Sequence, residues 1–212
     1  MPVAAVVVAA GRGSRFGGEK QFLFIDGDTV AARSVSRARE VSDLVVLVVP
    51  EGYSGTGEGA DLVVTGGDSR AASVRNGLAH CGDADIVIVH DAARPNASGD
   101  LFRAIVRTIE EGADAVVPGL PVADTVKRVT IDGQKTVVAE TLNRDDLVAV
   151  QTPQGFRRSV LERAHATSDV ATDDAGLVEA IGGLVVVIPG EASNLKITHP
   201  SDLDRLIEGS RS

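Results

Sequence analysis

The sequence predicts an α/β protein whose mostly parallel β-sheet carries helices on both faces. Apolar, β-branched runs at residues 3–10, 44–49 and 86–89 do not alternate with polar residues. Such runs are typical of strands that are buried on both faces. Stretches with helical spacing of apolar residues separate these runs, and strands that alternate with helices indicate a parallel sheet.

The first part of the chain alternates between the two kinds of element. Asp28 or Thr29 can cap the first helix, and Pro50 and Pro118 are placed to end strands. The expected strands are residues 3–10, 44–49, 62–64, 86–89 and 115–117, and the expected helices are residues 28–39, 71–80 and 100–111. In the second helix, we expect three side chains to face the core, those of Ala72, Leu78 and Ala79.

Residues 122–142 depart from this rhythm, because two alternating stretches are joined by Asp132-Gly133. Asp-Gly between such stretches is a strong signal of a β-hairpin. A polar hairpin has little core of its own, so we expect this arm, at about residues 121–146, to pack on a second subunit. The elements expected after it are a strand at 147–151, residues 152–156 leading into a helix to about 165, a helix from 172–174 to about 182, a strand at 184–188, an extended segment at 194–197 and a closing helix at 201–208.

The bulk properties describe one globular domain over residues 1–212. A formal net charge of −9 argues against a surface that coats nucleic acid. Cys81 is the only cysteine, so there is no disulfide framework and a cytoplasmic setting is expected. No apolar run reaches the ~18 residues of a membrane span, and the N-terminus lacks the basic region of a signal peptide. We therefore expect neither nucleic acid nor a membrane as a partner.

Three of the expected strands end in polar loops, at residues 11–20, 66–70 and 91–94. In open parallel sheets, ligands bind at the carboxyl ends of strands, so we expect these loops to face one crevice. Glycines in the first loop let backbone amides approach a ligand, and Arg15 and Lys20 indicate that this ligand is an anion. A nucleoside triphosphate fits this pattern best, and a plain glycine turn with solvated basic side chains is the alternative.

The first loop differs from two common phosphate-binding loops. A dinucleotide-binding loop reads G-x-G-x-x-G, but here Phe16 stands in the position of the third glycine. A Walker A loop needs glycine directly before its lysine, but here that position is Glu19. The spacing therefore excludes both a Rossmann oxidoreductase and a P-loop protein.

Asp91 directly follows a buried strand, where aspartate often holds Mg²⁺ on a triphosphate, although a turn carboxylate is the alternative. Arg94 fits either a phosphate or carboxylate contact or a structural ion pair. Residues 66–70 could offer backbone groups to the edge of a base, with Arg70 and Ser73 supporting this loop. The alternative is a plain turn at the start of a helix. The histidines have no metal-ligand spacing, and three of them, His80, His165 and His199, are expected at helix ends or surface turns.

Eight motifs occur in a set order: AAGRGSR, KQF, GGDSRAASV, VHDAARP, DTVKR, TPQGF, TDDA and NLKIT. In this combination the chain resembles the 2-C-methyl-D-erythritol 4-phosphate cytidylyltransferases from Val6 to about Leu206. The resemblance implies a Rossmann-like nucleotidyltransferase fold with a β-arm that clasps a partner in a homodimer. It also implies transfer of a cytidylyl group from CTP to the polyol phosphate, with Mg²⁺ and release of pyrophosphate.

The resemblance implies roles for particular residues. The implied catalytic residues are Arg15, Lys20, Lys196 and Asp91, the last as the Mg²⁺ ligand. The implied nucleotide contacts are Ala9, Ala10, Gly11, Gly13, Gly67, Asp68, Arg70, Ser73 and Ala92. The implied acceptor contacts are Thr125, Arg144, Thr152 and Arg94, of which Thr125 and Arg144 are expected from the partner subunit. Because the attacking phosphate oxygen is already an anion, the reaction needs no strong general base, and the sequence offers no obvious one.

The chain departs from the family pattern beside the lysine of its KQF motif. Family members often carry a proline directly before this lysine, where this chain has Glu19, and the stretch at Gly17-Gly18 is short. The nearest alternative is a ribitol-5-phosphate cytidylyltransferase, which has nearly the same motifs. A more distant one is a sugar-1-phosphate or molybdopterin nucleotidyltransferase, and one from another class is a non-catalytic, dimeric nucleotide-binding module.

Overall fold

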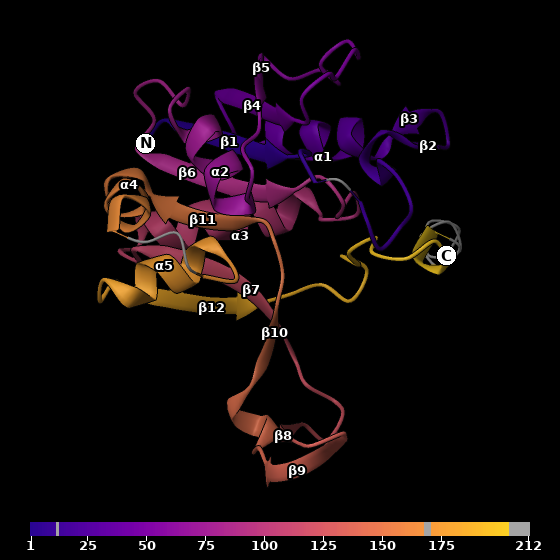
Figure 1. Cartoon of the computed structure of the whole chain (residues 1–212). Helices are drawn as coiled ribbons and strands as arrows, with labels where there is room; N and C mark the ends of the chain where they lie inside the picture. Colours follow the sequence, from indigo (N-terminus) through magenta and orange to yellow (C-terminus); the bar gives the residue numbers. More distant parts are fainter. Residues whose placement is uncertain (12, 168–170, 204–212) are drawn as a thin grey trace.

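The structure is a computed structural model that describes residues 1–11, 13–167 and 171–203. Its centre is an eight-stranded sheet flanked by helices (Figure 1). The strands of this sheet are β1 (Val3–Val8), β4 (Leu44–Val49), β5 (Leu62–Thr65), β6 (Ile86–Asp91), β7 (Ala115–Pro121), β10 (Val148–Val150), β11 (Gln154–Arg157) and β12 (Val185–Pro189). The helices are α1 (Val30–Arg39), α2 (Arg70–Leu78), α3 (Gly99–Glu110), α4 (Arg158–Thr167) and α5 (Asp174–Ala180).

Most neighbouring strands are parallel, which confirms the predicted fold class. The order across the sheet is β10-β7-β11-β6-β1-β4-β5, and β12 also pairs with β7. β1 is parallel to both β4 and β6, and the pairs β4–β5 and β7–β12 are parallel as well. The carboxyl ends of β1, β4, β5 and β6 therefore meet at one edge, where ligands of such sheets bind.

Helices cover both faces of the sheet, which explains the unbroken apolar runs. One core cluster joins Ala5 and Val7 of β1 to residues of α1 and α3. The other joins Ala4 and Val6 of the same strand to residues of α2, α4 and α5. Because successive side chains of a strand point to opposite faces, a strand between two helical layers must be apolar at every position.

The strand β11 was not expected, since residues 152–156 were predicted to lead directly into a helix. Instead β11 lies between β6 and β7 and is antiparallel to both, and α4 begins only at Arg158. Gly155 permits this position, because a Cβ there would lie 2.2 Å from the Ile105 side chain of α3. A run as short as Gln-Gly-Phe-Arg has too little periodicity to be recognised as a strand.

Pro118 does not end a strand, because β7 continues to Pro121. The carbonyl oxygen of Pro118 accepts a hydrogen bond from the Gln151 N–H at 2.8 Å, so this position is used as an acceptor. Proline lacks only the N–H donor, and its carbonyl still joins the ladder.

The first helix begins at Val30, after a small hairpin of β2 (Phe24–Ile25) and β3 (Asp28–Thr29) that was not predicted. Asp26 and Gly27 have φ angles of 50° and 96°, the positive values that a tight two-residue turn requires. Thr29 caps the helix as one of the two predicted candidates, since its Oγ1 accepts a hydrogen bond from the Ala32 N–H.

The inward face of α2 differs in part from the prediction. Leu78 is buried as expected, but Ala79 is exposed and Ala72 is only partly buried. Val74 and Gly77 take the inward positions, and Gly77 lies so close to β1 that a Cβ there would be 2.4 Å from Val6. Gly77 and Leu78 follow Val74 by three and four residues, and positions with this spacing share one face of a helix.

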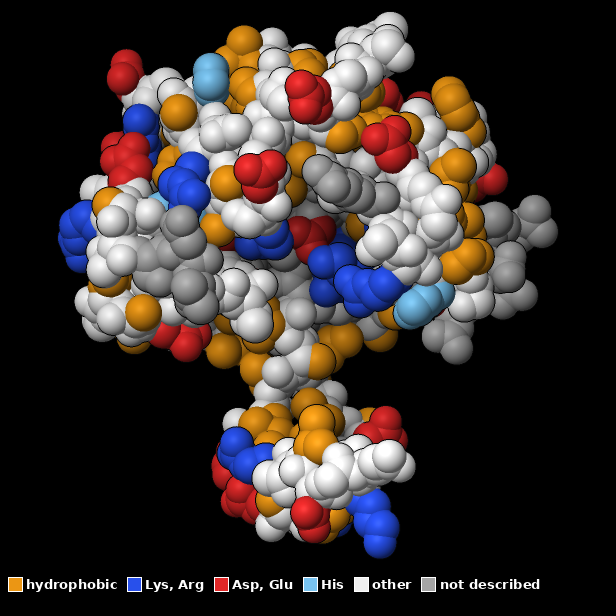
Figure 2. Space-filling view, in the orientation of Figure 1, with side chains coloured by type: hydrophobic (Ala, Val, Ile, Leu, Met, Phe, Trp, Pro, Cys, Tyr) orange, Lys and Arg blue, Asp and Glu red, His pale blue; other side chains and the backbone are white. Residues whose placement is uncertain are grey.

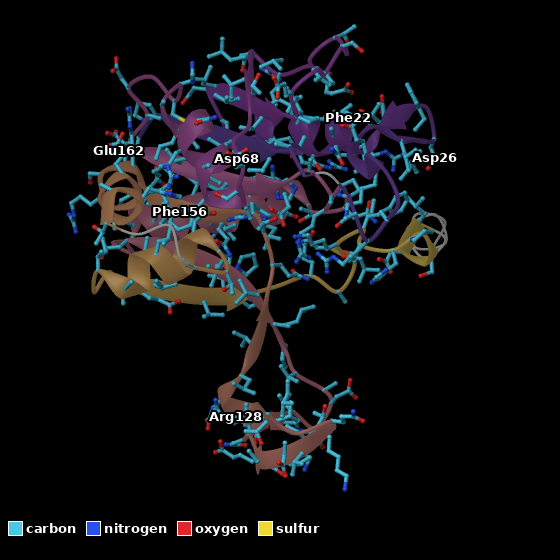
Figure 3. All side chains as sticks on the ribbon, in the orientation of Figure 1. Phe22, Asp26, Asp68, Arg128, Phe156 and Glu162 are labelled. Carbon is cyan, nitrogen blue, oxygen red and sulfur yellow. The ribbon has the colours of Figure 1, made fainter. Side chains whose placement is uncertain are left out.

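The predicted hairpin is confirmed as an arm of β8 (Lys127–Asp132) and β9 (Lys135–Thr141). It projects from the body of the molecule (Figure 1), and every residue of its two strands is exposed. Figure 3 shows Arg128 on this arm, well separated from Phe156 in the body. Four large apolar side chains of the arm are 43% to 85% exposed: Val129, Ile131, Val137 and Val138.

Two further expectations concern the end of the chain and membranes. The closing helix expected at 201–208 lies partly outside the described residues, since only 201–203 are described and these are helical. Within the described part of the chain, no helix combines the length and the apolar character that crossing a bilayer requires.

Candidate active site

A cavity of about 330 Å³ lies at the carboxyl ends of β1 and β6, beside the start of α2. All three loops that were predicted to share a crevice contribute to its wall. Figure 2 shows basic side chains and an acidic one gathered around a hollow in the body. The predicted site residues that line the cavity are Ala9, Ala10, Gly11, Gly13, Arg15, Lys20, Gly67, Asp68, Arg70, Ser73, Asp91 and Lys196.

The loop after β1 offers backbone donors to this cavity. The N–H groups of Ala10, Gly11 and Gly13 form no hydrogen bond within the described part of the chain. Gly13 has a φ angle of 60°, and a Cβ there would lie 1.9 Å from the Gly18 carbonyl oxygen, so only glycine fits. Successive unpaired N–H groups in a glycine turn form a concavity that binds anions.

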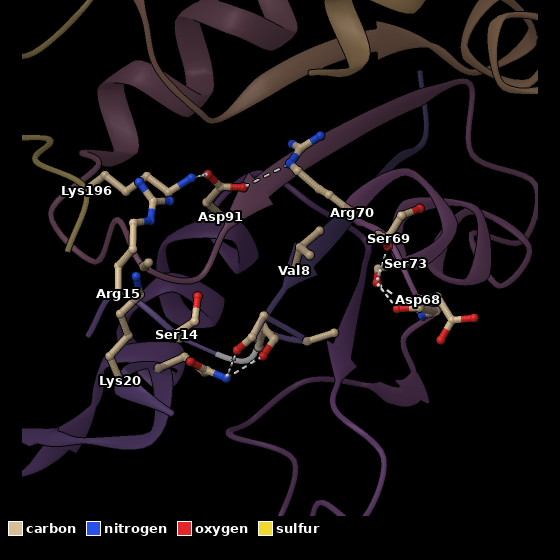
Figure 4. A pocket seen from close by; sticks show the side chains of 17 residues that line it. Val8, Ser14, Arg15, Lys20, Asp68, Ser69, Arg70, Ser73, Asp91 and Lys196 are labelled. Carbon is tan, nitrogen blue, oxygen red and sulfur yellow. Dashed lines mark hydrogen bonds and ion pairs between the residues drawn. The ribbon is translucent and has the colours of Figure 1, made fainter. Parts of the chain in front are cut away.

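Three basic residues lie together on one side of the cavity. Figure 4 shows Arg15, Lys20 and Lys196 together on this side, with Asp68 and Ser73 on the other. Lys20 begins the one-turn 3-10 helix η1 (Lys20–Phe22). Burial, together with the nearby charges of Lys196 and Arg15, lowers the pKa of Lys20 below its ordinary value. A bound phosphate chain would relieve this mutual repulsion.

We expect the kcat/KM for the nucleotide to fall at alkaline pH. The fall should begin at a lower pH than the titration of an ordinary lysine would give. Lys20 binds an anion only in its charged form, which is lost as the pH rises through its lowered pKa. A pH profile of kcat/KM measures this, because it reports the free enzyme. The arginine of Lys20→Arg stays charged to a higher pH, so the alkaline decline of kcat/KM in this variant should shift to higher pH. An unshifted decline would assign the titration to another group.

Asp91 lies between two cations at the floor of the cavity (Figure 4). Its Oδ2 is 2.6 Å from Nζ of Lys196, and its Oδ1 is 3.4 Å from Nε of Arg70. Burial alone would raise the pKa of Asp91, but Arg70 and Lys196 outweigh it and hold the pKa well below its ordinary value. The carboxylate is therefore charged, and it holds both cations in place.

Arg70 is itself held from behind by a buried pair that the sequence did not indicate. Its Nη1 is 2.6 Å from Oδ2 of Asp174, whose Oδ1 is 3.0 Å from Nε2 of His165. Asp174 and His165 are 1% and 5% exposed. His165 lies in the last turn of α4, at a helix end as predicted, but its side chain is buried there. Its position in α4 brings it against the first turn of α5, where Asp174 lies.

The loop between β5 and α2 forms the opposite wall. Ser73 Oγ accepts a hydrogen bond from the Gly67 N–H at 3.1 Å and donates one to the Ser69 carbonyl at 2.9 Å. A Cβ on Gly66 would lie 2.4 Å from Cβ of Ala10, so glycine lets this loop approach the one after β1. This close, hydrogen-bonded wall presents backbone groups and the exposed Asp68 to a flat ligand.

A second cavity of about 270 Å³ adjoins the first and shares Arg70, Asp91 and Lys196 with it. Arg94 and Thr152, which were predicted to contact the acceptor substrate, line the second cavity but not the first. The other lining residues were not predicted as site residues and are Val150, Gln151, Gln154, Thr172 and Asp173. The TDDA motif contains two of them, but the sequence was interpreted there only as a helix cap.

A buried histidine holds Thr152 in place. His90 Nε2 lies 3.2 Å from the carbonyl oxygen of Arg94, which can only accept, so Nε2 carries the proton. Nδ1 then accepts from the Thr152 hydroxyl at 3.2 Å, while Thr152 Oγ1 accepts from the Asp91 N–H at 3.0 Å. Burial lowers the pKa of His90 to about 4, so the ring is neutral at physiological pH. Its role is to position Thr152.

The segment that carries Lys196 is held by two buried amides that were not predicted. Gln151 donates from Nε2 to the carbonyl oxygen of Glu191 at 2.9 Å and accepts at Oε1 from the Glu191 N–H at 3.1 Å. Asn194 is fully buried and donates to the Thr152 carbonyl at 2.8 Å. These contacts join the end of the chain to the connection between β10 and β11, so Lys196 reaches Asp91.

A comparison with known families decides the identity. The sequence model of one family, the 2-C-methyl-D-erythritol 4-phosphate cytidylyltransferases, matches residues 3–206 of this chain. The chain belongs to this family. A curated member from Frankia casuarinae is 46% identical over 211 residues, which cover 95% of this chain and 78% of that protein. One from Rhodococcus opacus is also 46% identical, over 95% of this chain and 92% of its own.

Solved structures of the family agree with this assignment. The crystal structure of the family member from Thermus thermophilus is 34% identical, covers 100% of both chains and superposes with a TM-score of 0.84. A structure from Anaerococcus prevotii, named as the 4-diphosphocytidyl-2C-methyl-D-erythritol synthase, gives a TM-score of 0.81 at 27% identity. The predicted fold class and family are therefore confirmed.

Three residues that the family resemblance implicated do not line either cavity. Ala92 is fully buried, its carbonyl accepts a hydrogen bond from Ser34, and its neighbour Ala93 takes the place on the wall. Thr125 and Arg144 belong to the arm region and are exposed. Arg144 donates to the Ala123 carbonyl there. Within one chain the cavities are thus completed without these two side chains.

One carboxylate on the cavity wall, that of Asp91, could hold a metal ion together with the phosphates of a bound nucleotide. Among the described residues, no three histidine, cysteine or acidic side chains come together to form a metal site. Asp91 is a single charged carboxylate on the cavity wall, already paired with two cations. Mg²⁺ in nucleotide enzymes commonly uses one or two carboxylates together with substrate phosphates, which this arrangement matches.

Proposed function

We propose that this chain carries out the reaction of its family, the transfer of a cytidylyl group from CTP to 2-C-methyl-D-erythritol 4-phosphate. The first cavity would hold CTP and the second the acceptor. An oxygen of the acceptor phosphate attacks the α-phosphorus in line. The bond from this phosphorus to the bridging oxygen breaks, and its electron pair leaves with pyrophosphate. We also infer that the enzyme works in the cytoplasm, where both phosphorylated substrates are metabolites.

The observation that carries this proposal is the wall that both cavities share. Arg70, Asp91 and Lys196 line both, so a phosphate in one cavity lies beside a phosphate in the other. Asp91 does not need to act as a base, since its pKa is held far below neutrality and the nucleophile is already an anion. The shared wall therefore has to compensate the negative charge of the two phosphates.

Positive charge on the wall supports this role. Two anions must meet, and negative charge grows on the equatorial oxygens of the α-phosphorus in the transition state. Lys20 and Arg15 approach from the nucleotide side, and Lys196 lies between the cavities. Donors fixed in advance at such a position need no reorganisation during the reaction. Mg²⁺, held by Asp91 and the phosphates, would neutralise further charge on the triphosphate.

The opposite wall is where the base of the nucleotide would bind. Gly67, Asp68 and Ser73 lie there, and the loop is held rigidly by the Ser73 hydroxyl. Backbone donors and acceptors at fixed positions can tell cytosine from uracil, because a mismatched group would stay unpaired.

The decisive experiment is an assay of pyrophosphate release with purified protein and Mg²⁺. We expect release with CTP and 2-C-methyl-D-erythritol 4-phosphate and much slower release with the other nucleoside triphosphates. Turnover with CTP only in the presence of ribitol phosphate would instead favour the sister activity. An absence of turnover with any pair would favour a non-catalytic nucleotide-binding module.

We further propose that the enzyme is a homodimer in which each arm completes the site of the other subunit. The arm has exposed apolar side chains and little core of its own, which is typical of an interface. Thr125 and Arg144 lie at its base, outside the cavities of their own chain. In the dimer these two side chains would contact the acceptor phosphate in the partner's second cavity.

We expect Arg144→Ala to raise the KM for the acceptor about tenfold or more, with little change in the KM for CTP, because a charged donor to phosphate is lost. A mixture with inactive Lys20→Ala tests whether Arg144 acts across subunits. Subunit exchange would rebuild one intact site in each mixed dimer and restore about a quarter of the wild-type activity at low acceptor concentration. A mixture without recovery, or an active monomer, would contradict the shared site.

A further inference from the structure

We propose that Gln21 is a positioning residue that sets Lys20 and the phosphate-binding loop relative to each other. Gln21 is the middle residue of η1, lines the first cavity and is 3% exposed. Its Nε2 donates to the carbonyl oxygens of Ala9 at 2.7 Å and of Gly11 at 3.1 Å. One side-chain amide thus joins the turn that carries Lys20 to the loop that offers unpaired N–H groups. The inference rests on the proposed function, since both parts face the triphosphate.

The two bonds also decide how the loop presents its donors. In a planar trans peptide, the C=O and the N–H point in opposite directions. Because Gln21 holds the Ala9 carbonyl, the Ala10 N–H points away from Gln21, and it forms no hydrogen bond in the described part of the chain. A peptide turned the other way would present its carbonyl oxygen to the triphosphate and repel it. Gln21 therefore favours the orientation of the loop that binds an anion.

Each residue of η1 has a separate contact, so the roles can be told apart. Lys20 lines the cavity, and Phe22 packs against Tyr53 with the rings tilted by 33° and their centroids 4.9 Å apart. The Phe22 contact fixes the turn on its apolar side but cannot direct carbonyl groups of the loop. Gln21 can serve two carbonyls because its amide nitrogen carries two hydrogens. No aliphatic or ionised acidic side chain of the same length can do this.

The test compares Gln21→Met, which keeps the length but removes both donors, with the control Asn76→Leu. Asn76 Nδ2 also donates to a distant carbonyl, that of Thr65 at 2.9 Å, but outside the cavity. For Gln21→Met we expect kcat/KM for CTP to fall about 30-fold, which corresponds to two hydrogen bonds of ordinary net strength. The KM for the acceptor should change less than about twofold, and the control should stay within about twofold of wild type.

A second variant, Gln21→Glu, gives a readout that a purely structural role would not move. The protonated carboxyl donates one hydrogen bond, whereas the ionised form donates none and adds negative charge beside the triphosphate. We expect its kcat/KM relative to wild type to rise as the pH falls from about 8 to about 6. This ratio decides the question if Gln21→Met does not fold.

Two results would overturn the inference. One is a folded Gln21→Met enzyme with the wild-type kcat/KM for CTP, and the other is a Gln21→Glu ratio that does not depend on pH. Failure of the proposed function has a different signature. In that case the wild-type protein itself would release no pyrophosphate from CTP and the acceptor.

Discussion

Lys20→Ala is expected to lower kcat by about 10²- to 10³-fold, the usual loss when one preorganised donor to a developing charge is removed. The dissociation constant for CTP should change far less. Lys20 is one of several positive or donor groups that hold the ground-state triphosphate, together with Arg15 and the loop N–H groups. The charge that builds at the α-phosphorus is compensated by fewer groups, so the transition state loses more than the ground state.

Single-turnover kinetics and equilibrium CTP binding separate these two effects. Arg107→Ala is a suitable control, because it removes an exposed cation of α3 that pairs with Glu111 at 3.9 Å and lies outside both cavities. We expect the control to keep its kcat. A Lys20→Ala enzyme with near-normal kcat would remove Lys20 from the catalytic residues, and weaker CTP binding at that unchanged kcat would make it a binding residue only.

Asp91→Asn is expected to lower kcat by about 10²-fold and also to destabilise the fold. The variant leaves Arg70 and Lys196 without the carboxylate that holds them at 3.4 and 2.6 Å. Asp91 is largely buried, but the side chains of Arg70 and Lys196 are 30% and 40% exposed, so the loss of stability should be about 2 kcal/mol, between the values for exposed and buried pairs. The two cations would also move from their catalytic positions. If Asp91 also binds Mg²⁺, the metal concentration that gives half-maximal rate should rise, which Lys20→Ala would not cause.

Urea unfolding and a Mg²⁺ titration of the rate measure the two parts of this prediction. Asp100→Asn is the matched control, since Asp100 pairs with Arg103 at 2.8 Å but its side chain is 90% exposed. An exposed pair contributes little, so the urea midpoint of the control should stay close to that of the wild type. An unchanged Mg²⁺ dependence in Asp91→Asn would oppose its role as a metal ligand, and unchanged stability would oppose the ion-pair account.

The sequence was sufficient for most residues of the first cavity because they follow the ends of strands. Gly11, Gly13 and Asp91 come directly after buried apolar runs, and the parallel sheet brings such positions to one edge. Lys196 was implied only by the family motif, since no strand end leads to it. The arm was predictable for a local reason as well, because Asp-Gly between alternating stretches specifies a hairpin.

The supporting residues were not predictable in this way. Gln151 and Asn194 meet because β10 and the C-terminal segment pass each other, although the two residues are 43 positions apart. Asp174 and Arg70 are 104 positions apart, and only the packing of α5 beside α2 and α4 joins them. Nothing in the local spacing indicates either pair, since buried polar side chains are chosen to satisfy whichever groups the fold places nearby.

By itself the sequence determined the parallel α/β architecture, the loops at the strand ends, the arm and the family, because these depend on local periodicity and on motif order. Only the tertiary structure decided that β11 inserts between β6 and β7, that two cavities share the Arg70–Asp91–Lys196 wall, and that Gln21 joins η1 to the glycine loop. The reason is physical. Local spacing sets which way a side chain points along its own element, whereas the distance between two elements depends on strand order and on the packing of helices between them.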